Sequence, residues 1–277
     1  MSYRFKQVDV FTDQALKGNP LAVVLGADDW TDTQMQSFAR WTNLSETTFL
    51  LRPTDPRADY RVRIFTPASE LPFAGHPTLG SCHAWLEAGG KPRAAGQVVQ
   101  QCGVGLVTLR QDGPRWAFAA PPMAAQELAP STLAAIVRAL GLREGQVRAA
   151  RLLDNGPKWM TLLLGSAEEV LAIEPDLSAL ARIGFVGVVG PHPQGHETQF
   201  EVRAFVAPDG IAEDPVTGSL NASIAQWLIG DGIAPRRYVA AQGTRMQRAG
   251  RVHIDASDDA VWVGGHSRTC IDGAAHL

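Results

Sequence analysis

The chain has 277 residues, of which 45% are hydrophobic and 19% are charged, and its formal net charge is -3. This composition supports a sizeable core and excludes a largely disordered chain, and the length fits two domains. The weakly acidic balance argues against a nucleic-acid-binding surface. Because no signal peptide and no membrane-length apolar run are visible, we expect a cytoplasmic protein with no membrane partner.

The cysteines and histidines give no metal-binding pattern. Cys82, Cys102 and Cys270 lack ligand spacing, and an odd number of cysteines argues against a disulfide framework. His192 and His196 lie close together, but the prolines and glycines around them indicate a surface turn. We therefore predict that no metal is bound.

The first half of the chain is expected to alternate strands with two helices. Thr31 or Asp32 is a plausible N-cap for a helix over 32–42. A second helix follows Pro77, and 123–130 is a candidate linker. The patterns of apolar residues predict strands at 4–11, 20–25, 47–52, 59–66, 96–101, 105–110 and 115–119.

The second half is expected to repeat this mixture. It opens with a predicted helix over 131–141, followed by a short helix over 177–182 and a helix over 215–229 that starts at a proline. Predicted strands lie at 148–153, 159–164, 184–189, 198–206, 236–241, 251–255, 260–264 and 268–273.

Two segments of the chain, 75–90 and 213–232, resemble each other. Their alignment pairs His76 with Asp214, so one ionisable residue stands at each predicted helix entrance. Further matching pairs are Pro77 with Pro215, Gly80 with Gly218, Ser81 with Ser219, 62–65 with 202–205, and Gly18-Asn19-Pro20 with Asn155-Gly156-Pro157. These matches predict a duplicated strand–loop–helix unit and two similar α+β domains.

The duplicated helix entrances are candidate anion sites. The first backbone N–H groups of a helix lack internal partners and lie at the positive end of its dipole. Gly80 and Gly218 would let a ligand approach the backbone, and Ser81 and Ser219 add hydroxyl groups. Two entrances facing one cleft would bind a carboxylate or phosphate. The structural alternative is two ordinary helices that begin near a proline.

Glu46 is the most informative carboxylate, because it lies at the turn between the first helix and an apolar strand. Partial desolvation by Leu44 and Phe49 would raise its pKa and make it a better proton shuttle near neutral pH. Alternatively, Glu46 is a solvated turn residue, or it bonds to Ser45 or to the local backbone.

His76 and Asp214 are the other chemical candidates. A histidine with an ordinary pKa can act as acid or base near neutral pH, or His76 is simply a hydrogen-bonded loop residue. Asp214 follows Glu213, so two carboxylates would repel each other if both were ionised. The alternative role for Asp214 is to cap the helix after it.

Several motifs together resemble the phenazine biosynthesis PhzF-like family over essentially the whole chain. They are Gly18-Asn19-Pro20, 43–49, 63–67, 70–80 and 213–219. The resemblance implies a diaminopimelate-epimerase-like α+β fold: two similar domains, each a curved, mostly antiparallel sheet around a central helix, with the active site in the interdomain cleft. The expected domains are 1–124, joined by a C-terminal strand over 266–277, and 125–265.

The resemblance also implies an activity. It predicts a cofactor-independent isomerase, usually a homodimer, that moves a proton on a small carboxylate, expected to be cyclic. Glu46, His76 and Asp214 match the family's catalytic positions. The substrate-binding positions implied by the motifs are Asn19, Ser45, Gly75, Pro77, Thr217, Gly218 and Ser219.

Two other functions stay open at this point. Related epimerases and racemases use a cysteine pair at the helix entrances, and this chain has no cysteine there. One alternative is therefore a cysteine-free amino-acid epimerase or racemase. The other is a non-catalytic carboxylate-binding or scaffold protein. The motifs do not single out the substrate of the phenazine enzyme.

Overall fold

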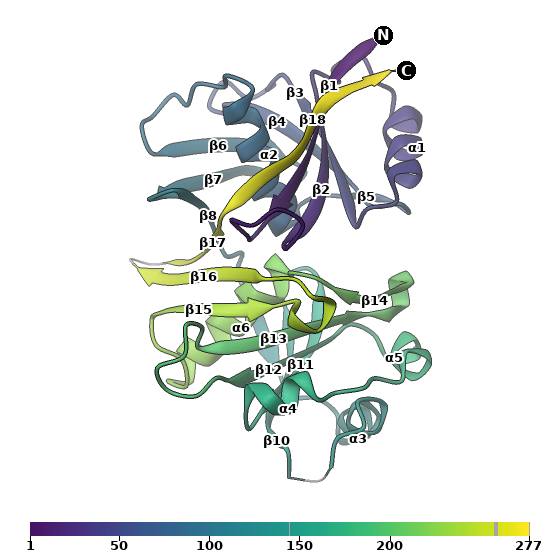
Figure 1. Ribbon diagram of the computed structural model, residues 1–277, viewed down its shortest axis with the longest axis vertical. Coiled ribbons are helices and arrows are strands. Elements are labelled where there is room, and N and C mark those ends of the chain that lie inside the picture. The colour runs from purple at the N-terminus through teal and green to yellow at the C-terminus, as the bar shows by residue number, and fades with distance from the viewer. Residues whose placement is uncertain (144, 258–259, 277) are drawn as a thin grey trace. The chain divides into compact units, whose positions relative to one another are not determined.

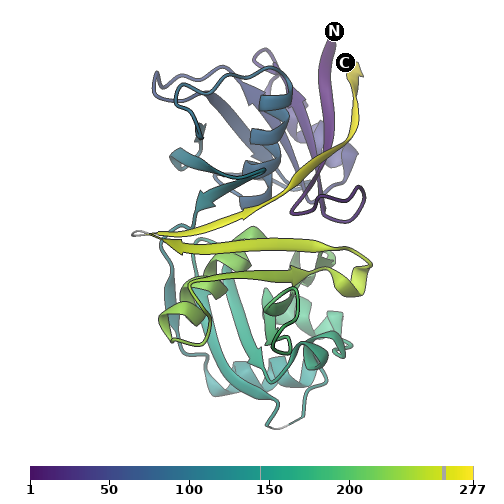
Figure 2. The same ribbon diagram turned by 60° about the vertical axis from the view of Figure 1, so that its left-hand side comes forward.

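The computed structural model describes residues 1–143, 145–257 and 260–276, and the chain divides into two compact units (Figure 1). The first unit combines Met1–Ala119 with Gly264–Leu277, and the second is Ala120–Val263. The last residue of the expected strand 266–277 lies outside the described residues. Both chain ends belong to the first unit, where their strands lie side by side (Figures 1 and 2).

The first unit is a sheet wrapped around one helix. Helix α2 (Gly75–Glu87) packs against several strands of the sheet, and most of its residues are buried. A helix that is apolar on all sides needs such a surrounding. In the order of pairing, the strands are β18 (Ser267–His276), β1 (Ser2–Val10), β2 (Asn19–Leu25), β3 (Glu46–Leu51), β4 (Tyr60–Phe65), β6 (Gln97–Cys102), β7 (Gly105–Asp112) and β8 (Arg115–Ala119), with β5 (Glu70–Leu71) paired to β4.

Helix α1 (Asp32–Thr42) covers the outside of this sheet with one apolar stripe. Its Phe38 packs with Trp30 and Phe49 in an aromatic cluster. Thr31 is the N-cap, and it forms a capping box with Gln34. The predicted bounds of this helix are therefore confirmed, and the choice between Thr31 and Asp32 as its cap is decided.

The second unit repeats the arrangement around helix α6 (Gly218–Gly230). In the order of pairing, its strands are β9 (Ala124–Gln126), β10 (Val147–Asp154), β11 (Lys158–Leu164), β12 (Val186–Pro191), β13 (Phe200–Val206), β15 (Arg237–Gln242) and β16 (Gly250–Ser257), with β14 (Ile211–Asp214) paired to β13. The remaining elements are α3 (Pro130–Ala139), α4 (Ala167–Leu171), α5 (Leu177–Ile183), β17 (Ala260–Gly265) and the 3-10 turns η1 (Ala207–Asp209) and η2 (Thr244–Met246).

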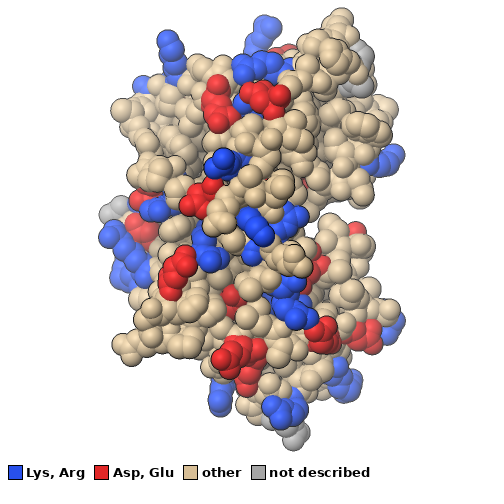
Figure 3. Space-filling view, viewed as in Figure 1, with Lys and Arg blue, Asp and Glu red and all other residues tan. Residues whose placement is uncertain are grey.

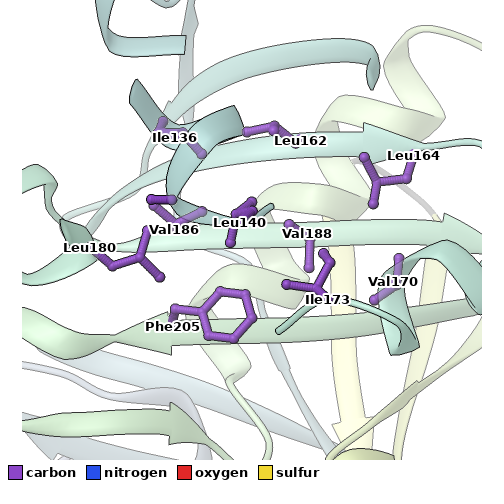
Figure 4. Close-up of a cluster of buried hydrophobic side chains, with 11 residues drawn as sticks. Ile136, Leu140, Leu162, Leu164, Val170, Ile173, Leu180, Val186, Val188 and Phe205 are labelled. Atoms are coloured by element: carbon purple, nitrogen blue, oxygen red, sulfur yellow. The ribbon is translucent and has the colours of Figure 1, made fainter. Parts of the chain in front are cut away.

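A hydrophobic core of the second unit lies where α3, α4 and α5 pack against its sheet (Figure 4). Leu162, Val188 and Phe205 come from three neighbouring strands and are fully buried. Each such side chain contributes roughly 1.5–3 kcal/mol of burial free energy.

The duplication seen in the sequence is also present in the strand pairing. The series β1, β2, β3, β4, β6, β7 pairs antiparallel, parallel, antiparallel, parallel, antiparallel. The series β10, β11, β12, β13, β15, β16 follows the same alternation. Antiparallel pairs predominate when the short and terminal strands are included, so the predicted α+β fold is confirmed.

An arginine cluster is repeated as well. The Arg63 guanidinium pairs in bidentate fashion with Glu70 and lies over the Phe65 ring, 5.1 Å from its centre. Arg203 pairs in the same way with a glutamate on β14 and lies 4.9 Å from the centre of the Phe205 ring. These arginines have a structural role in both units.

The helix expected over 215–229 begins later, at Gly218. The reason is that 211–214 extends the sheet: Asp214 pairs with Ala204 on β13, and Thr217 becomes the N-cap. The expected linker 123–130 contains strand β9, and helix α4 was not predicted. Strand β9 and helix α4 are too short to show a periodic pattern.

Acidic and basic side chains are interspersed on the face shown in Figure 3. Among the helices of the described ranges, none is both long enough and apolar enough to cross a membrane.

Candidate functional site

Glu46 and His76 meet in the first unit. Glu46 is the first residue of β3, and His76 is the second residue of α2. His76 Nε2 lies 3.4 Å from Glu46 Oε2, and the side chains are 6% and 17% exposed. The two atoms are close enough for a charge contact, but they are not aligned as a hydrogen bond. A carboxylate and an imidazole therefore lie side by side with little exposure to solvent.

Local sequence explains why Glu46 lies at this position. Helix α1 ends at Thr42 and is capped by Asn43, which adopts a left-handed conformation that asparagine tolerates better than most residues. Ser45 is half-buried in the turn that follows. Glu46 then enters the sheet opposite Leu21 of the parallel strand β2.

Asn19 reaches the same histidine from the start of β2. Its Nδ2 atom lies 3.4 Å from His76 Nδ1. The preceding turn is held by Asp9, whose carboxylate accepts hydrogen bonds from the backbone of Lys17 (2.8 Å) and Gly18 (3.3 Å). A side chain at Gly18 would clash with the Val10 carbonyl oxygen, so the turn requires glycine.

Burial makes His76 a neutral group. It lowers the pKa of His76 to about 3, and the start of helix α2 also disfavours a cation. The near-neutral pKa expected from sequence is therefore wrong for this histidine. If the Asn19 amide nitrogen donates to Nδ1, hydrogen-bond logic assigns the remaining ring proton to Nε2, which faces Glu46.

The first turn of α2 includes two further predicted residues. Gly75 is its first residue and Pro77 its third, and both are buried. Proline is tolerated there because the first N–H groups of a helix have no internal partner.

Gly80 and Ser81 serve packing, contrary to the prediction of a ligand-binding role. A Cβ atom at Gly80 would lie 2.6 Å from the Leu21 side chain and 2.8 Å from that of Val10. The buried Ser81 hydroxyl donates to the Thr48 hydroxyl at 2.9 Å. The missing side chain at Gly80 lets α2 approach β1 and β2 closely.

The second unit presents Asp214 at the start of α6. Asp214 ends β14, and Thr217 is the N-cap, so the alternative that Asp214 caps the helix is wrong. Instead, the Thr217 hydroxyl donates to Asp214 Oδ2 at 2.5 Å. Within the described residues, no side chain caps the N–H groups at Gly218 and Ser219. This helix start can accept an anion.

The repulsion expected between Glu213 and Asp214 is offset by Arg203. Its guanidinium donates to both Glu213 carboxylate oxygens, at 3.0 and 2.8 Å. Arg203 is 4% exposed and also donates to the backbone carbonyls of Val170 and Ile173.

Ser219 is held by two residues that the sequence did not identify as site residues. Trp159 Nε1 donates to the Ser219 hydroxyl at 3.1 Å, and Asn155 Nδ2 donates to the Ser219 carbonyl at 2.9 Å. Asn155 thus approaches the start of α6 as Asn19 approaches α2. The repeated Asn/Gly/Pro turn was the available signal for Asn155. Gln242 and Asn221, also missed, bond to the loop before α6 and had no such signal.

The structure gives no metal-binding geometry in the part of the chain that it describes. There, no three His, Cys, Asp or Glu side chains are arranged to hold an ion. His192 and His196 stack with ring centres 4.0 Å apart. Cys82 is fully buried, and burial raises the pKa of its thiol far above the usual value.

The structure thus brings Glu46, His76 and Asn19 together in the first unit. It groups Asp214, Thr217, Gly218 and Ser219 in the second unit. The first group suits proton transfer, and the second suits binding of a carboxylate.

Comparisons with known proteins agree on one family. The family model described as "Phenazine biosynthesis-like protein" (PhzC-PhzF) matches residues 8–273. The chain is 36% identical to "Antisense-enhancing sequence 1" of Schizosaccharomyces pombe, covering 99% of each chain. It is 33% identical to trans-2,3-dihydro-3-hydroxyanthranilate isomerase of Pseudomonas aeruginosa, covering 99% of this chain and 100% of that one. A PhzF-family crystal structure from Enterococcus faecalis superposes with a TM-score of 0.84 at 26% identity, covering 100% of both chains.

Proposed function

This chain belongs to the phenazine biosynthesis-like (PhzC-PhzF) family and is an isomerase, and on that premise we propose that it moves a proton between carbons of a small carboxylate by Glu46 acid–base catalysis. The observation that carries the proposal is the Glu46–His76 pair, a poorly solvated carboxylate beside an imidazole that stays neutral.

In this proposal Glu46 acts twice. Its carboxylate removes a proton from an activated carbon, and the electron pair moves into the adjacent double-bond system. The protonated Glu46 then returns the proton to a different carbon, so the substrate and product have the same composition. No external oxidant or reductant is needed.

The other groups bind and polarise the substrate. The N–H groups of Gly218 and Ser219 bind the substrate carboxylate. Asp214 orients a polar substituent, and the His76 Nε2 proton stabilises charge near Glu46. General acid–base catalysis of this kind contributes about 10²–10⁴-fold to the rate.

The relative from Pseudomonas aeruginosa suggests the substrate class. Its name specifies an isomerase of a dihydro-hydroxyanthranilate, which is a cyclic carboxylate with amino and hydroxyl groups. We therefore propose a small cyclic carboxylate as the substrate class of this chain.

The test is a screen of small cyclic carboxylates and amino acids in heavy water, read by mass spectrometry. Wild type should place deuterium on a carbon of at least one compound. Glu46→Gln should bind that compound but lose about 10²–10⁴-fold in turnover. Glu127→Gln, which changes an 88% exposed carboxylate, is the matched control and should behave as wild type.

The outcome also separates the other functions. Wild-type turnover by Glu46→Gln would contradict the proposal. Exchange at the α-carbon with inversion would identify a cysteine-free epimerase. Binding without exchange by any of the proteins would identify a carboxylate-binding protein.

A further inference from the structure

A buried glutamine lies behind Asp214 in the second unit. Gln242, at the end of β15, is fully buried, and its amide uses both ends. Oε1 accepts from the Thr217 backbone N–H at 3.1 Å and from Asn221 Nδ2 at 2.7 Å. Nε2 donates to the Asp214 carbonyl at 3.1 Å and to the Thr217 hydroxyl at 2.9 Å. Two donors and two acceptor positions are thus satisfied, which fixes the orientation of the amide.

These hydrogen bonds fix which group the Thr217 hydroxyl donates to. Because the oxygen of Thr217 accepts from Gln242, its single proton is left to donate to Asp214 Oδ2 at 2.5 Å. The same amide also holds the Asp214 backbone carbonyl. Gln242 therefore contacts the Asp214 backbone directly and orients the Thr217 hydroxyl that donates to its carboxylate.

A second buried glutamine, Gln100, makes hydrogen bonds within the first unit and serves as a comparison for Gln242. Gln100 lies on β6, the strand that matches β15 in the repeated topology, and is also fully buried. It accepts from the Tyr60 hydroxyl at 2.8 Å and donates to the Thr78 hydroxyl at 3.0 Å. Neither partner is a carboxylate, so Gln100 is the matched control.

We propose that Gln242 is a positioning residue that, through Thr217, holds the Asp214 carboxylate in place before the start of α6. The role of Asp214 in catalysis rests on the proposed function, but its hydrogen bonding does not. Gln242 itself touches no reacting atom.

The test replaces the amide by a carboxylate of nearly the same volume. Gln242→Glu removes both donated hydrogen bonds and allows the Thr217 hydroxyl to turn away from Asp214. It also places a negative charge nearby. The carboxyl ¹³C signal of Asp214, assigned with Asp214→Asn, should titrate about one pH unit higher than in wild type. Gln100→Glu should leave this titration unchanged.

Kinetics supply the second readout. The acidic limb of kcat/KM against pH should move upward with the Asp214 titration in Gln242→Glu and stay in place in Gln100→Glu. An unchanged Asp214 titration in Gln242→Glu would overturn the inference. If the titration moves but wild type moves no proton on any substrate, the proposed function fails and the positioning role stands.

Variants at Thr217 keep the test decisive if Gln242→Glu does not fold. Thr217→Val removes the hydroxyl that donates to Asp214 Oδ2 and should raise the Asp214 titration, whereas Thr217→Ser retains a hydroxyl and should restore it. Equal titrations in these two variants would contradict the relay through Thr217.

Discussion

At the scale of single residues, burial changes the chemistry that the sequence suggests. A solvated histidine has a pKa near neutrality and can act as an acid or a base, but desolvation lowers the pKa of His76 and keeps it uncharged. A neutral imidazole beside Glu46 does not form a fixed ion pair with the carboxylate. This arrangement supports the proposal that Glu46 acts as the base.

Because His76 is neutral, we expect it not to titrate near neutral pH. Its imidazole ¹H and ¹³C signals should not move between pH 5 and 8, since its pKa is about 3. A His76 midpoint near 6.5 would contradict this account.

The lowered pKa of His76 also makes the stability of the fold depend on pH. The unfolded chain binds a proton at His76 below its ordinary pKa of 6.5, whereas the folded protein does so only near pH 3. Stability from the neutral histidine is thus present above pH 6.5 and is lost as the pH falls toward 3.

The sequence predicted some site residues and not others for physical reasons. The turn that holds Glu46 follows from local signals, a capped helix followed by an apolar strand. The buried position of His76 and its contact with Asn19, 57 residues away in the sequence, arise only in the folded chain. Gln242 carries no motif, and only the fold brings its amide to Asp214.

At the scale of elements, the two central helices begin differently although their sequences match. Helix α2 includes Pro77 in its first turn, whereas α6 starts beyond Pro215. Asp214 aligns with His76, but Asp214 belongs to strand β14 and pairs with β13, whereas His76 lies inside helix α2. Aligned glycines therefore have different tasks: Gly80 lies within a helix, and Gly218 lies at a helix start.

The packing role of Gly80 gives a stability prediction. Gly80→Ala would push a methyl group into Leu21 and Val10, and should lower the free energy of unfolding by about 1–3 kcal/mol. Urea denaturation measures this change.

Gly230→Ala is the matched control, because it lies at the exposed end of α6 with open space around it. It should be neutral or stabilising by up to about 1 kcal/mol. Equal stability of the two variants would show that Gly80 is not needed for packing.

At the scale of the whole molecule, the duplication was the part of the fold that the sequence predicted best. Matching Arg-x-Phe strands and matching helix entrances implied two related units, and the same pairing series occurs in both. The shortest elements, β5, β9, β14 and α4, were missed because their stability comes from neighbouring strands and helices rather than from local patterns.

The repeated architecture also explains how two chemical roles arose on one chain. Each unit offers a helix start beside a strand end, and the aligned positions carry different ionisable residues. In the first unit this residue is a histidine next to Glu46, and in the second it is Asp214, which accepts from the N-cap residue Thr217. On this basis we propose that proton transfer belongs to Glu46.

The most direct test of that claim is cleavage of the carbon–deuterium bond in a single turnover, measured by rapid quench with a substrate from the screen deuterated at the reacting carbon. With enzyme in excess and all substrate bound, Glu46→Gln should cleave this bond at least about 100-fold more slowly than wild type. Equal rates in the two proteins would contradict the account, because another group would then be the base.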